Sequence, residues 1–287
     1  MEICVNAPSM FPSVFMPRPL DSHKGTFGTL AIIGGSQGMS GAIVLASTAA
    51  VYTGCGKVWA GFHQKTLPMP IIAQHPEIML ACAHELLIRE DISAWVTGCG
   101  LGLDEDAVIV LEKVLSKSMN APLLLDADAL TLLSQRPQLS TLAQQHSHLI
   151  LTPHPTEAAR LLGISTADIQ ADRHSAVKAI AQKYQATVVL KGHHSLVYAF
   201  DNDTLYTNHS GNPGLATAGS GDVLSGVIGA LCAQGIDNWQ ATCAGVWLHG
   251  AAADYLASQI GGEIGLLSSE LPHAVRYIRN RAIQQRK

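Results

Sequence analysis

The chain has 287 residues, of which 47% are hydrophobic and 14% charged, and its formal net charge is -4 at pH 7. This composition supplies a globular core and excludes wholesale disorder. Because Lys and Arg form no run and no apolar stretch is long enough to span a bilayer, we expect neither a nucleic-acid nor a membrane partner. The six cysteines form no C-x-x-C pair and the thirteen histidines are scattered, so we expect a reducing, cytoplasmic location.

The predicted elements alternate between short strands and longer helices. Residues 1–22 contain four prolines and predict an extended lead-in, with order beginning near His23. Residues 29–33, 34–41 and 42–52 then predict a strand, a glycine-rich turn and a buried helix. Five further strands are predicted at residues 58–62, 95–98, 123–126, 149–152 and 188–191, and a β-ribbon at 195–200 and 204–207. From Asp222 the chain reads as helical, with Gly235 and Gly261 as helix ends.

This alternation predicts an α/β fold in which an open, mostly parallel, doubly wound sheet carries helices on both faces. No repeat or linker divides the chain, so residues 23–287 are expected to form a single domain. Ligands of such sheets bind beyond the carboxyl ends of the strands. Candidate functional residues are therefore those that follow each predicted strand.

The sequence GNPGLATAGSGDVLSG, at residues 211–226, is the strongest of these candidates. Gly219 and Gly221 allow backbone N–H groups to approach a phosphate, and the helix that follows turns its positive end toward an anion. Asp222, in the first helical turn, is placed to take a proton from an attacking hydroxyl. The alternative is that Asp222 only caps this helix.

A second candidate is LTPHPTEAARLLG, at residues 151–163, in which Pro155 or Thr156 can start a helix. Glu157 would then face the pocket and could reach a magnesium-bound water or a phosphate. The alternative for Glu157 is a favourable charge at a helix N-terminus, and that for His154 is a turn residue.

A third candidate is VVLKGHHSLVY, where Lys191 and Gly192 follow a predicted strand. The pair could place a cation and an open backbone against a nucleotide phosphate. The alternative is a surface turn in which His193 and His194 are solvated.

Two further glycine-rich loops follow predicted strands. The loop within residues 32–46 does not match G-x-G-x-x-G, and no acid follows the next strand, which disfavours a dehydrogenase. In the loop 96–102, Gly102 permits close approach of a ligand. Asp126 and Asp128 could assist a metal or bind a hydroxyl, although capping the next helix is the preferred interpretation.

Five segments in register resemble the ADP/ATP-dependent NAD(P)H-hydrate dehydratases, a branch of the ribokinase-like superfamily. They are HKGTFGTLAIIGGSQGMSGA, TGCGLG, LTPHPTEAARLLG, VVLKGHHSLVY and NPGLATAGSGDVLSG. The resemblance runs from about His23 to the C-terminal helices and implies a ribokinase-like fold. It also implies dehydration of (6S)-NADHX and (6S)-NADPHX to NADH and NADPH, with ADP (or ATP) as co-substrate, Mg²⁺ as cofactor, and release of AMP and phosphate from ADP.

Carried over by position, the resemblance implies a set of site residues in this chain. Asp222 would be catalytic and would also bind the hydrated dinucleotide together with Ala42, Gly102 and His154. The nucleotide would contact Lys191, Gly192, His193, His194, Ser195 and Gly221. The residue pattern itself adds Gly219 and Ser220 to the nucleotide site, and Glu157 as a weaker candidate for a metal ligand.

The resemblance also implies a homo-oligomer, with a tetramer favoured. Ser220, Cys99 and Thr156 stand where the family commonly has Thr, Pro and Gly. Two rival interpretations remain open at this point. One is a small-molecule kinase acting on a vitamin or sugar, and the other is a nucleotide-sensing protein without turnover.

Overall fold

The computed structural model describes residues 7–285, and its strands form one nine-stranded sheet in the order β3-β2-β1-β4-β5-β6-β7-β8-β9. Neighbouring strands from β3 to β7 are parallel, whereas β8 is antiparallel to both β7 and β9. The strands are β1 (Thr29–Gly34), β2 (Lys57–Phe62), β3 (Met79–Cys82), β4 (Ala94–Thr97), β5 (Leu123–Leu125), β6 (Leu149–Leu151), β7 (Thr187–Leu190), β8 (Leu196–Ala199) and β9 (Thr204–Thr207).

All the predicted strands are present, but sequence reasoning missed β3. Its four residues lie at one edge of the sheet, pair only with β2, and are largely half-buried. Such a short edge strand has neither a continuous apolar run nor a clear alternation, so its pattern does not separate it from a loop.

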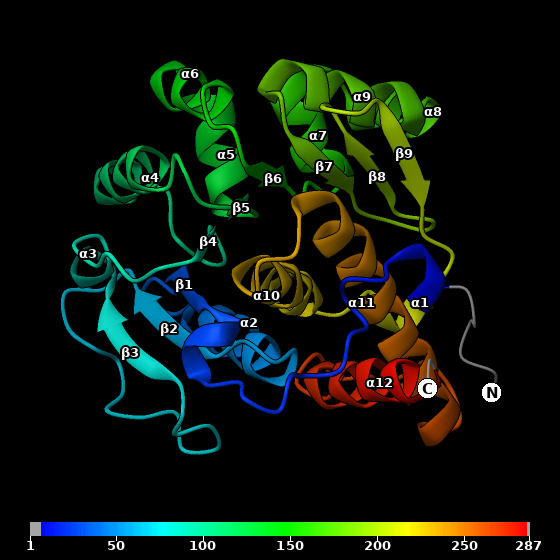
Figure 1. The fold of residues 1–287 in the computed structure, drawn as a ribbon. Coiled ribbons are helices and arrows are strands. Elements are labelled where there is room, and N and C mark those ends of the chain that lie inside the picture. Colours follow the sequence, from blue (N-terminus) through cyan, green and yellow to red (C-terminus); the bar gives the residue numbers. More distant parts are fainter. Residues whose placement is uncertain (1–6, 286–287) are drawn as a thin grey trace.

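Helices cover both faces of the sheet, which confirms the doubly wound prediction (Figure 1). One face carries α2, α10, α11 and α12, and the other carries α3 to α9. The helices are α1 (Ala7–Met10), α2 (Ser40–Tyr52), α3 (Ala83–Leu86), α4 (Glu105–Lys117), α5 (Asp128–Gln135), α6 (Pro137–Gln144), α7 (Pro155–Leu162), α8 (Thr166–Ala171), α9 (Arg173–Tyr184), α10 (Ser220–Ala233), α11 (Asn238–Ile260) and α12 (Leu271–Gln285).

Strand β1 shows why the sheet needs two layers of helices. Leu30 and Ile32 belong to the hydrophobic cluster on one face, and Ala31 and Ile33 to the cluster on the other. All four are fully buried. Successive side chains of a strand point to opposite faces, so an unbroken apolar run requires a cover on both sides.

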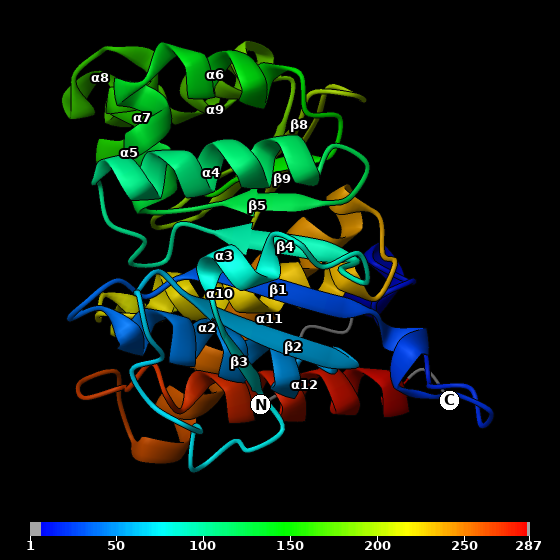
Figure 2. The same cartoon turned by 90° about the vertical axis from the view of Figure 1, so that its left-hand side faces the viewer.

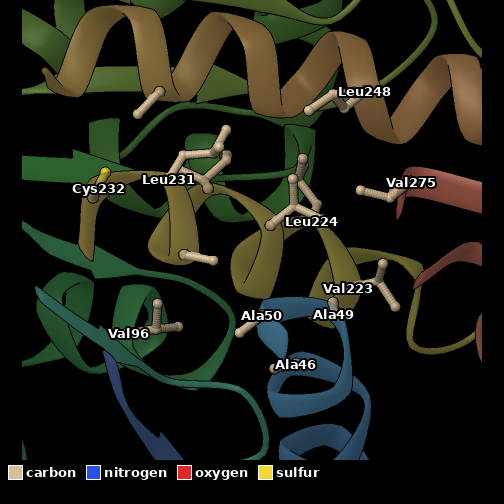
Figure 3. Packing of buried hydrophobic residues seen from close by; sticks show 14 of the residues in the cluster. Ala46, Ala49, Ala50, Val96, Val223, Leu224, Leu231, Cys232, Leu248 and Val275 are labelled. Atoms are coloured by element: carbon tan, nitrogen blue, oxygen red, sulfur yellow. The ribbon is translucent and has the colours of Figure 1, made fainter. Parts of the chain in front are cut away.

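Helix α10 is held in place by close packing against α2 (Figure 3). Ala46, Ala49 and Ala50 of α2 lie beside the start of α10, and Leu248 of α11 lies on its other side. Gly226 of α10 approaches α2 so closely that a Cβ there would lie 2.1 Å from the Ala46 carbonyl oxygen. This packing fixes the helix whose first turn carries Asp222.

Helix α12 closes the layer at the β2–β3 end of the sheet, whereas α6 to α9 lie at the opposite end of the molecule (Figure 2).

In contrast to the predicted start of order near His23, earlier residues belong to the core. Phe11, Val14 and Phe15 are at most 4% exposed. The Val14 carbonyl accepts hydrogen bonds from Arg279 of α12. The segment was predicted as a lead-in because its prolines are turn signals and its apolar residues follow no helical or strand period.

Candidate functional site

The candidate site lies at the N-terminus of α10, beyond the carboxyl ends of the parallel strands. Helix α10 begins at Ser220 after the N-cap Gly219, whose φ is +86°. A Cβ on Gly219 would come within 2.3 Å of Leu45, so only glycine fits this turn. The first turn of α10 therefore presents free N–H groups and the positive end of its dipole.

Asp222 is the third residue of α10 and is half-buried. Burial raises the pKa of its carboxyl from 3.8 to about 6, although a hydrogen bond from the Cys99 thiol opposes the rise. The N-cap Gly219 makes no side-chain cap hydrogen bond, and Asp222 is the acidic residue of the first turn, where its charge favours the helix dipole. Its pKa also suits a group that exchanges protons near neutral pH, so its catalytic role stays a prediction.

Next to Asp222 lies a buried cluster of opposite charges. Lys191 Nζ, just after β7, lies 2.7 Å from Asp126 Oδ1 and 3.9 Å from Glu157 Oε2. Asp126 is 2% exposed, and its Oδ2 accepts a hydrogen bond from Ser225 Oγ of α10 at 2.8 Å. Burial lowers the pKa of Lys191, but Asp126 and Glu157 outweigh that effect and raise it. The Lys191 ammonium is therefore held charged beneath the start of α10.

Glu157 and His154 form a capping box at the start of α7. His154 Nδ1 accepts from the Thr156 and Glu157 backbone N–H groups, and Glu157 Oε2 accepts from the His154 N–H at 2.8 Å. Helix α7 starts at Pro155, as predicted. Burial raises the pKa of Glu157 to about 7, against the lowering effect of Lys191. Both interpretations of Glu157 thus have structural support, and its role toward a metal stays a prediction.

Ala42 and Gly102 belong to two loops that contact each other, and one of them holds Cys99, which bonds Asp222. A Cβ on Gly100 would lie 3.4 Å from the Ala42 Cβ, so the two residues are close. The Ser36 N–H donates to the Gly100 carbonyl at 2.7 Å. Gly102 has a φ of +89°, and its N–H donates to Asp128 Oδ2 at 2.8 Å. These contacts place the loops after β1, β4 and β5 side by side at the carboxyl edge.

The prediction that Asp126 and Asp128 cap the next helix is wrong. The N-cap of α5 is Ala127, which makes no side-chain cap hydrogen bond, and among the backbone N–H groups at this helix start Asp126 Oδ1 accepts only that of the N-cap residue, at 2.9 Å. Asp126 instead bonds Lys191 and Ser225, and Asp128 bonds Gly102. Ala127 between them has φ 49° and ψ −117°, a conformation that costs a non-glycine residue on the order of 1–3 kcal/mol. The two carboxylates therefore link this strained turn to Lys191 and α10 through Asp126, and to the loop that contains Gly102 through Asp128.

Sequence reasoning also missed a hydrogen-bonded cluster beside Gly102. His63, directly after β2, lies with Nδ1 2.7 Å from the Leu101 carbonyl and Nε2 2.9 Å from Asp106 Oδ2. His84 Nε2 lies 3.1 Å from the same carboxylate. Because His63 directly follows a predicted strand, its position could have marked it as a candidate functional residue. The cluster anchors the loop that contains Gly102.

A cavity of about 450 Å³ opens between the loop after β7, the segment after β9 and helices α10 and α11. Predicted nucleotide-binding residues from two distant segments share its wall, whereas Gly219 is not among the lining residues. His209 and His249, which were not predicted, complete a mixed polar and apolar lining. The residues from the predicted set are Lys191, Gly192, His193, His194, Ser195, Ser220 and Gly221.

Within residues 7–285, no group of three or more His, Cys, Asp or Glu side chains is arranged to hold a metal ion by itself. The same part of the chain contains no helix that is both long and apolar enough to cross a bilayer.

Three histidine rings lie beside one another at the cavity. The rings of His193 and His194 are stacked with their centroids 3.9 Å apart, and that of His209 lies 4.8 Å from His194. They form a row at the cavity wall.

The fold and site define a ribokinase-like α/β protein. Hydroxyethylthiazole kinase of Pyrococcus horikoshii, at 14% identity, has the same fold with a TM-score of 0.62, covering 98% of this chain and 94% of that one. A sequence model of the NAD(P)H-hydrate dehydratase family matches residues 30–275. The chain belongs to this family.

Individual relatives agree with that assignment. The chain is 58% identical to the ADP-dependent (S)-NAD(P)H-hydrate dehydratase of Neisseria meningitidis, over 94% of this chain and 91% of that protein. It is 41% identical to the bifunctional NAD(P)H-hydrate repair enzyme of Escherichia coli, of which it spans only 50%. The Bacillus subtilis ADP/ATP-dependent NAD(P)H-hydrate dehydratase, co-crystallised with ATP and Mg²⁺, matches with a TM-score of 0.83 at 29% identity, covering 98% of this chain and 99% of that one.

Proposed function

We propose that this chain dehydrates (6S)-NADHX and (6S)-NADPHX to NADH and NADPH, with cleavage of ADP to AMP and phosphate. The observation that carries the proposal is the position of Asp222. It lies between the Lys191 side of the site and the loop of Gly102, with a pKa of about 6. The Neisseria meningitidis relative supports the choice of substrates and of ADP.

In the proposed reaction, Asp222 accepts the proton of the 6-hydroxyl of the hydrated nicotinamide as that oxygen attacks the terminal phosphorus of ADP. AMP leaves, and the phosphate ester then departs from the ring as phosphate while a ring proton is lost, which restores the double bond. The N–H groups of Gly221 and Asp222 would hold the phosphoryl oxygens, and the Lys191 ammonium, which lies beside Asp126, would offset part of their charge.

Mg²⁺ fits this site only together with the nucleotide. The described residues offer no complete protein cage, but Mg²⁺ commonly needs only one or two carboxylates beside phosphates and water. Glu157, 6% exposed and turned toward Lys191 and Asp126, is the residue that would hold it. When bound, the ion supplies charge neutralisation for the phosphates. We expect chelation to stop turnover and added Mg²⁺ to restore it, as measured by phosphate release.

The test is incubation of the protein with (6S)-NADHX, ADP and Mg²⁺, followed by the absorbance of reduced nicotinamide and the release of phosphate. The proposal predicts equal amounts of NADH, AMP and phosphate. A kinase of the same fold would instead leave a stable phosphorylated substrate and no free phosphate. That result would replace the proposal with the kinase alternative.

We also propose a cytoplasmic homo-oligomer, with a tetramer favoured by the resemblance to the family. The nucleotide-sensing alternative predicts binding without turnover, and the same assay tests it. Light scattering of the purified protein tests the tetramer, and a monomer in solution would contradict it.

A further inference from the structure

Two histidines are buried in the same way but differ in their hydrogen bonds. His146 is 1% exposed and His249 is 7% exposed, and burial lowers the pKa of each to about 4, so both are neutral. His146 Nε2 lies 3.0 Å from Ser118 Oγ, and its Nδ1 accepts from the His148 N–H at 3.2 Å. Within residues 7–285, His249 Nε2 has no hydrogen-bond partner. A buried polar atom without a partner is costly in a native protein and needs an explanation.

His249 differs from His146 also in its position, because it lines the 450 Å³ cavity. Leu224 of α10 and Val246 of α11 are both at most 5% exposed and line the same cavity, as does Leu215. These three apolar side chains form one part of a lining that is otherwise mixed, and an apolar surface suits a flat ring. A polar group beside that surface can then set which ring is accepted.

The segment after β9, which forms part of the cavity wall, packs closely against α11. A Cβ on Gly250 would lie 2.3 Å from Ser210 Oγ, so glycine allows the segment after β9 to rest on α11. Ser210 Oγ also donates to the Trp247 carbonyl at 3.0 Å. Asp254, one turn further along α11, accepts hydrogen bonds from the Gly211 N–H and from Asn212 at 2.8 and 3.0 Å. His249, next to Gly250, therefore lies on a helix against which the segment after β9 is held.

The tautomer of His249 follows from its contacts. A hydrogen bond to the Ser220 backbone raises its pKa and so favours the protonated ring, which means that the ring donates to the Ser220 carbonyl. Because Nε2 is the atom without a partner, the donor is Nδ1. In a neutral imidazole the other nitrogen is then an acceptor only. Nε2 therefore requires a donor from a ligand.

We propose that His249 Nε2 accepts a hydrogen bond from the exocyclic amino group of adenine, and that this contact selects adenine nucleotides in the ADP site. Hypoxanthine carries a carbonyl oxygen at the same ring position, so its lone pairs would face those of Nε2. Reversing the tautomer would break the bond to Ser220. The inference rests on the proposed function for the presence of ADP, but it adds the residue and the atom that read the base.

The experiment compares ADP with inosine diphosphate, IDP, in the wild type, in His249→Leu and in His146→Leu. Losing one hydrogen bond to a buried acceptor should cost about ten- to a hundred-fold in kcat/KM for ADP. The His249→Leu variant should lose this factor for ADP and little for IDP, so that the ADP/IDP ratio falls toward one. His146→Leu should keep the wild-type ratio even if its melting temperature falls. Circular dichroism checks that each variant is folded.

Calorimetry with ADP and IDP separates this inference from the proposed function. If the wild type binds ADP but does not convert (6S)-NADHX, the proposed function fails, and a lower ADP/IDP affinity ratio in His249→Leu still supports the inference. If folded His249→Leu keeps the wild-type ratio in binding and turnover, the inference is overturned. A ratio near one in the wild type would overturn it as well.

Discussion

The two edges of the sheet carry cavities of opposite character. The groove at the amino edge has a volume of about 730 Å³ and is lined by residues that precede the strands, such as Thr26, Ser93 and His148. Of its aspartates, Asp237 caps α11, and no ion pair joins its lining residues within the described chain. The smaller cavity at the carboxyl edge adjoins the buried Lys191–Asp126 pair. Cavity size therefore does not locate the chemistry, whereas buried charge does.

The difference has a physical origin in α10, which runs from one edge to the other. Its first residues, Ser220 and Gly221, line the carboxyl-edge cavity, and its last residues, Cys232 and Ala233, line the amino-edge groove. The helix therefore turns its positive end toward the first and its negative end toward the second. At α10, the end suited to bind phosphate is therefore the one at the carboxyl edge.

The largest effect is expected from Asp222→Asn. The substitution removes the proposed base while keeping the size of the side chain, so kcat should fall by about 10²–10⁴ with the fold and ADP affinity preserved. Asp237→Asn at the amino edge is the matched control, because Asp237 accepts from Gln240 N–H as the cap of α11. It should cost at most about 1 kcal/mol of stability. Asp222→Asn with wild-type turnover would contradict the assignment.

The second prediction compares two lysine–aspartate pairs. Lys191→Met leaves Asp126 buried without its partner and should lower the unfolding free energy by roughly 3–5 kcal/mol, measured by denaturant titration. The added substitution Asp126→Asn should restore much of that stability but not ADP affinity. Lys57 and Asp91, 2.9 Å apart and partly exposed at the amino edge, form the control pair, and Lys57→Met should cost at most about 1 kcal/mol. Equal losses from the two lysine substitutions would remove the distinction between the edges.

The third prediction concerns pH. Burial raises the folded-state pKa of Asp222 from 3.8 to about 6 and that of Glu157 from 4.5 to about 7. At these two carboxyls the folded state therefore binds more protons than the unfolded state between about pH 4 and 7, so their contribution to stability should fall as the pH rises through this window. His146 and His249, whose pKa burial lowers to about 4, contribute the opposite trend. Over the same window kcat should rise, because Asp222 must ionise to act as the base.

Denaturant titrations and rate profiles from pH 4 to 8 measure both trends. The stability of Asp222→Asn relative to the wild type should rise with pH between about 4 and 6, and that of Glu157→Gln between about 4.5 and 7. A difference that does not change with pH would show that the fold does not raise the pKa of that carboxyl.

The smallest effect is expected from relief of backbone strain. Ala127→Gly should raise the unfolding free energy by about 1 kcal/mol, because glycine accepts φ 49° and ψ −117° without the steric cost paid by alanine. Gln185 precedes β7 at the amino edge and has φ 51° and ψ 43°. This left-handed helical conformation is less strained, so Gln185→Gly should gain less. A loss of stability in Ala127→Gly would show that Ala127 is not strained.

Much of the fold was predictable because its signals are local. Most strands are short apolar runs, β1 and β4 adjoin glycines, and Asp222 stands out as an acid between glycines and an apolar helix. The pairing of Lys191 with Asp126 was not predictable, since 65 residues separate them and the sheet order brings them together. His249 lies within a long helix without a local motif. Its significance appears only when the cavity and the unpartnered nitrogen are seen together.

The central claim is that the hydroxyl of the hydrated nicotinamide attacks ADP at the carboxyl edge, beside Asp222. The most direct test uses (6S)-NADHX with ¹⁸O in the 6-hydroxyl, incubated with ADP and Mg²⁺ and followed by mass spectrometry of the released phosphate. Transfer to this oxygen predicts that each phosphate carries the label and appears together with one NADH. Unlabelled phosphate, with the ¹⁸O retained in the dinucleotide or released as water, would contradict the account.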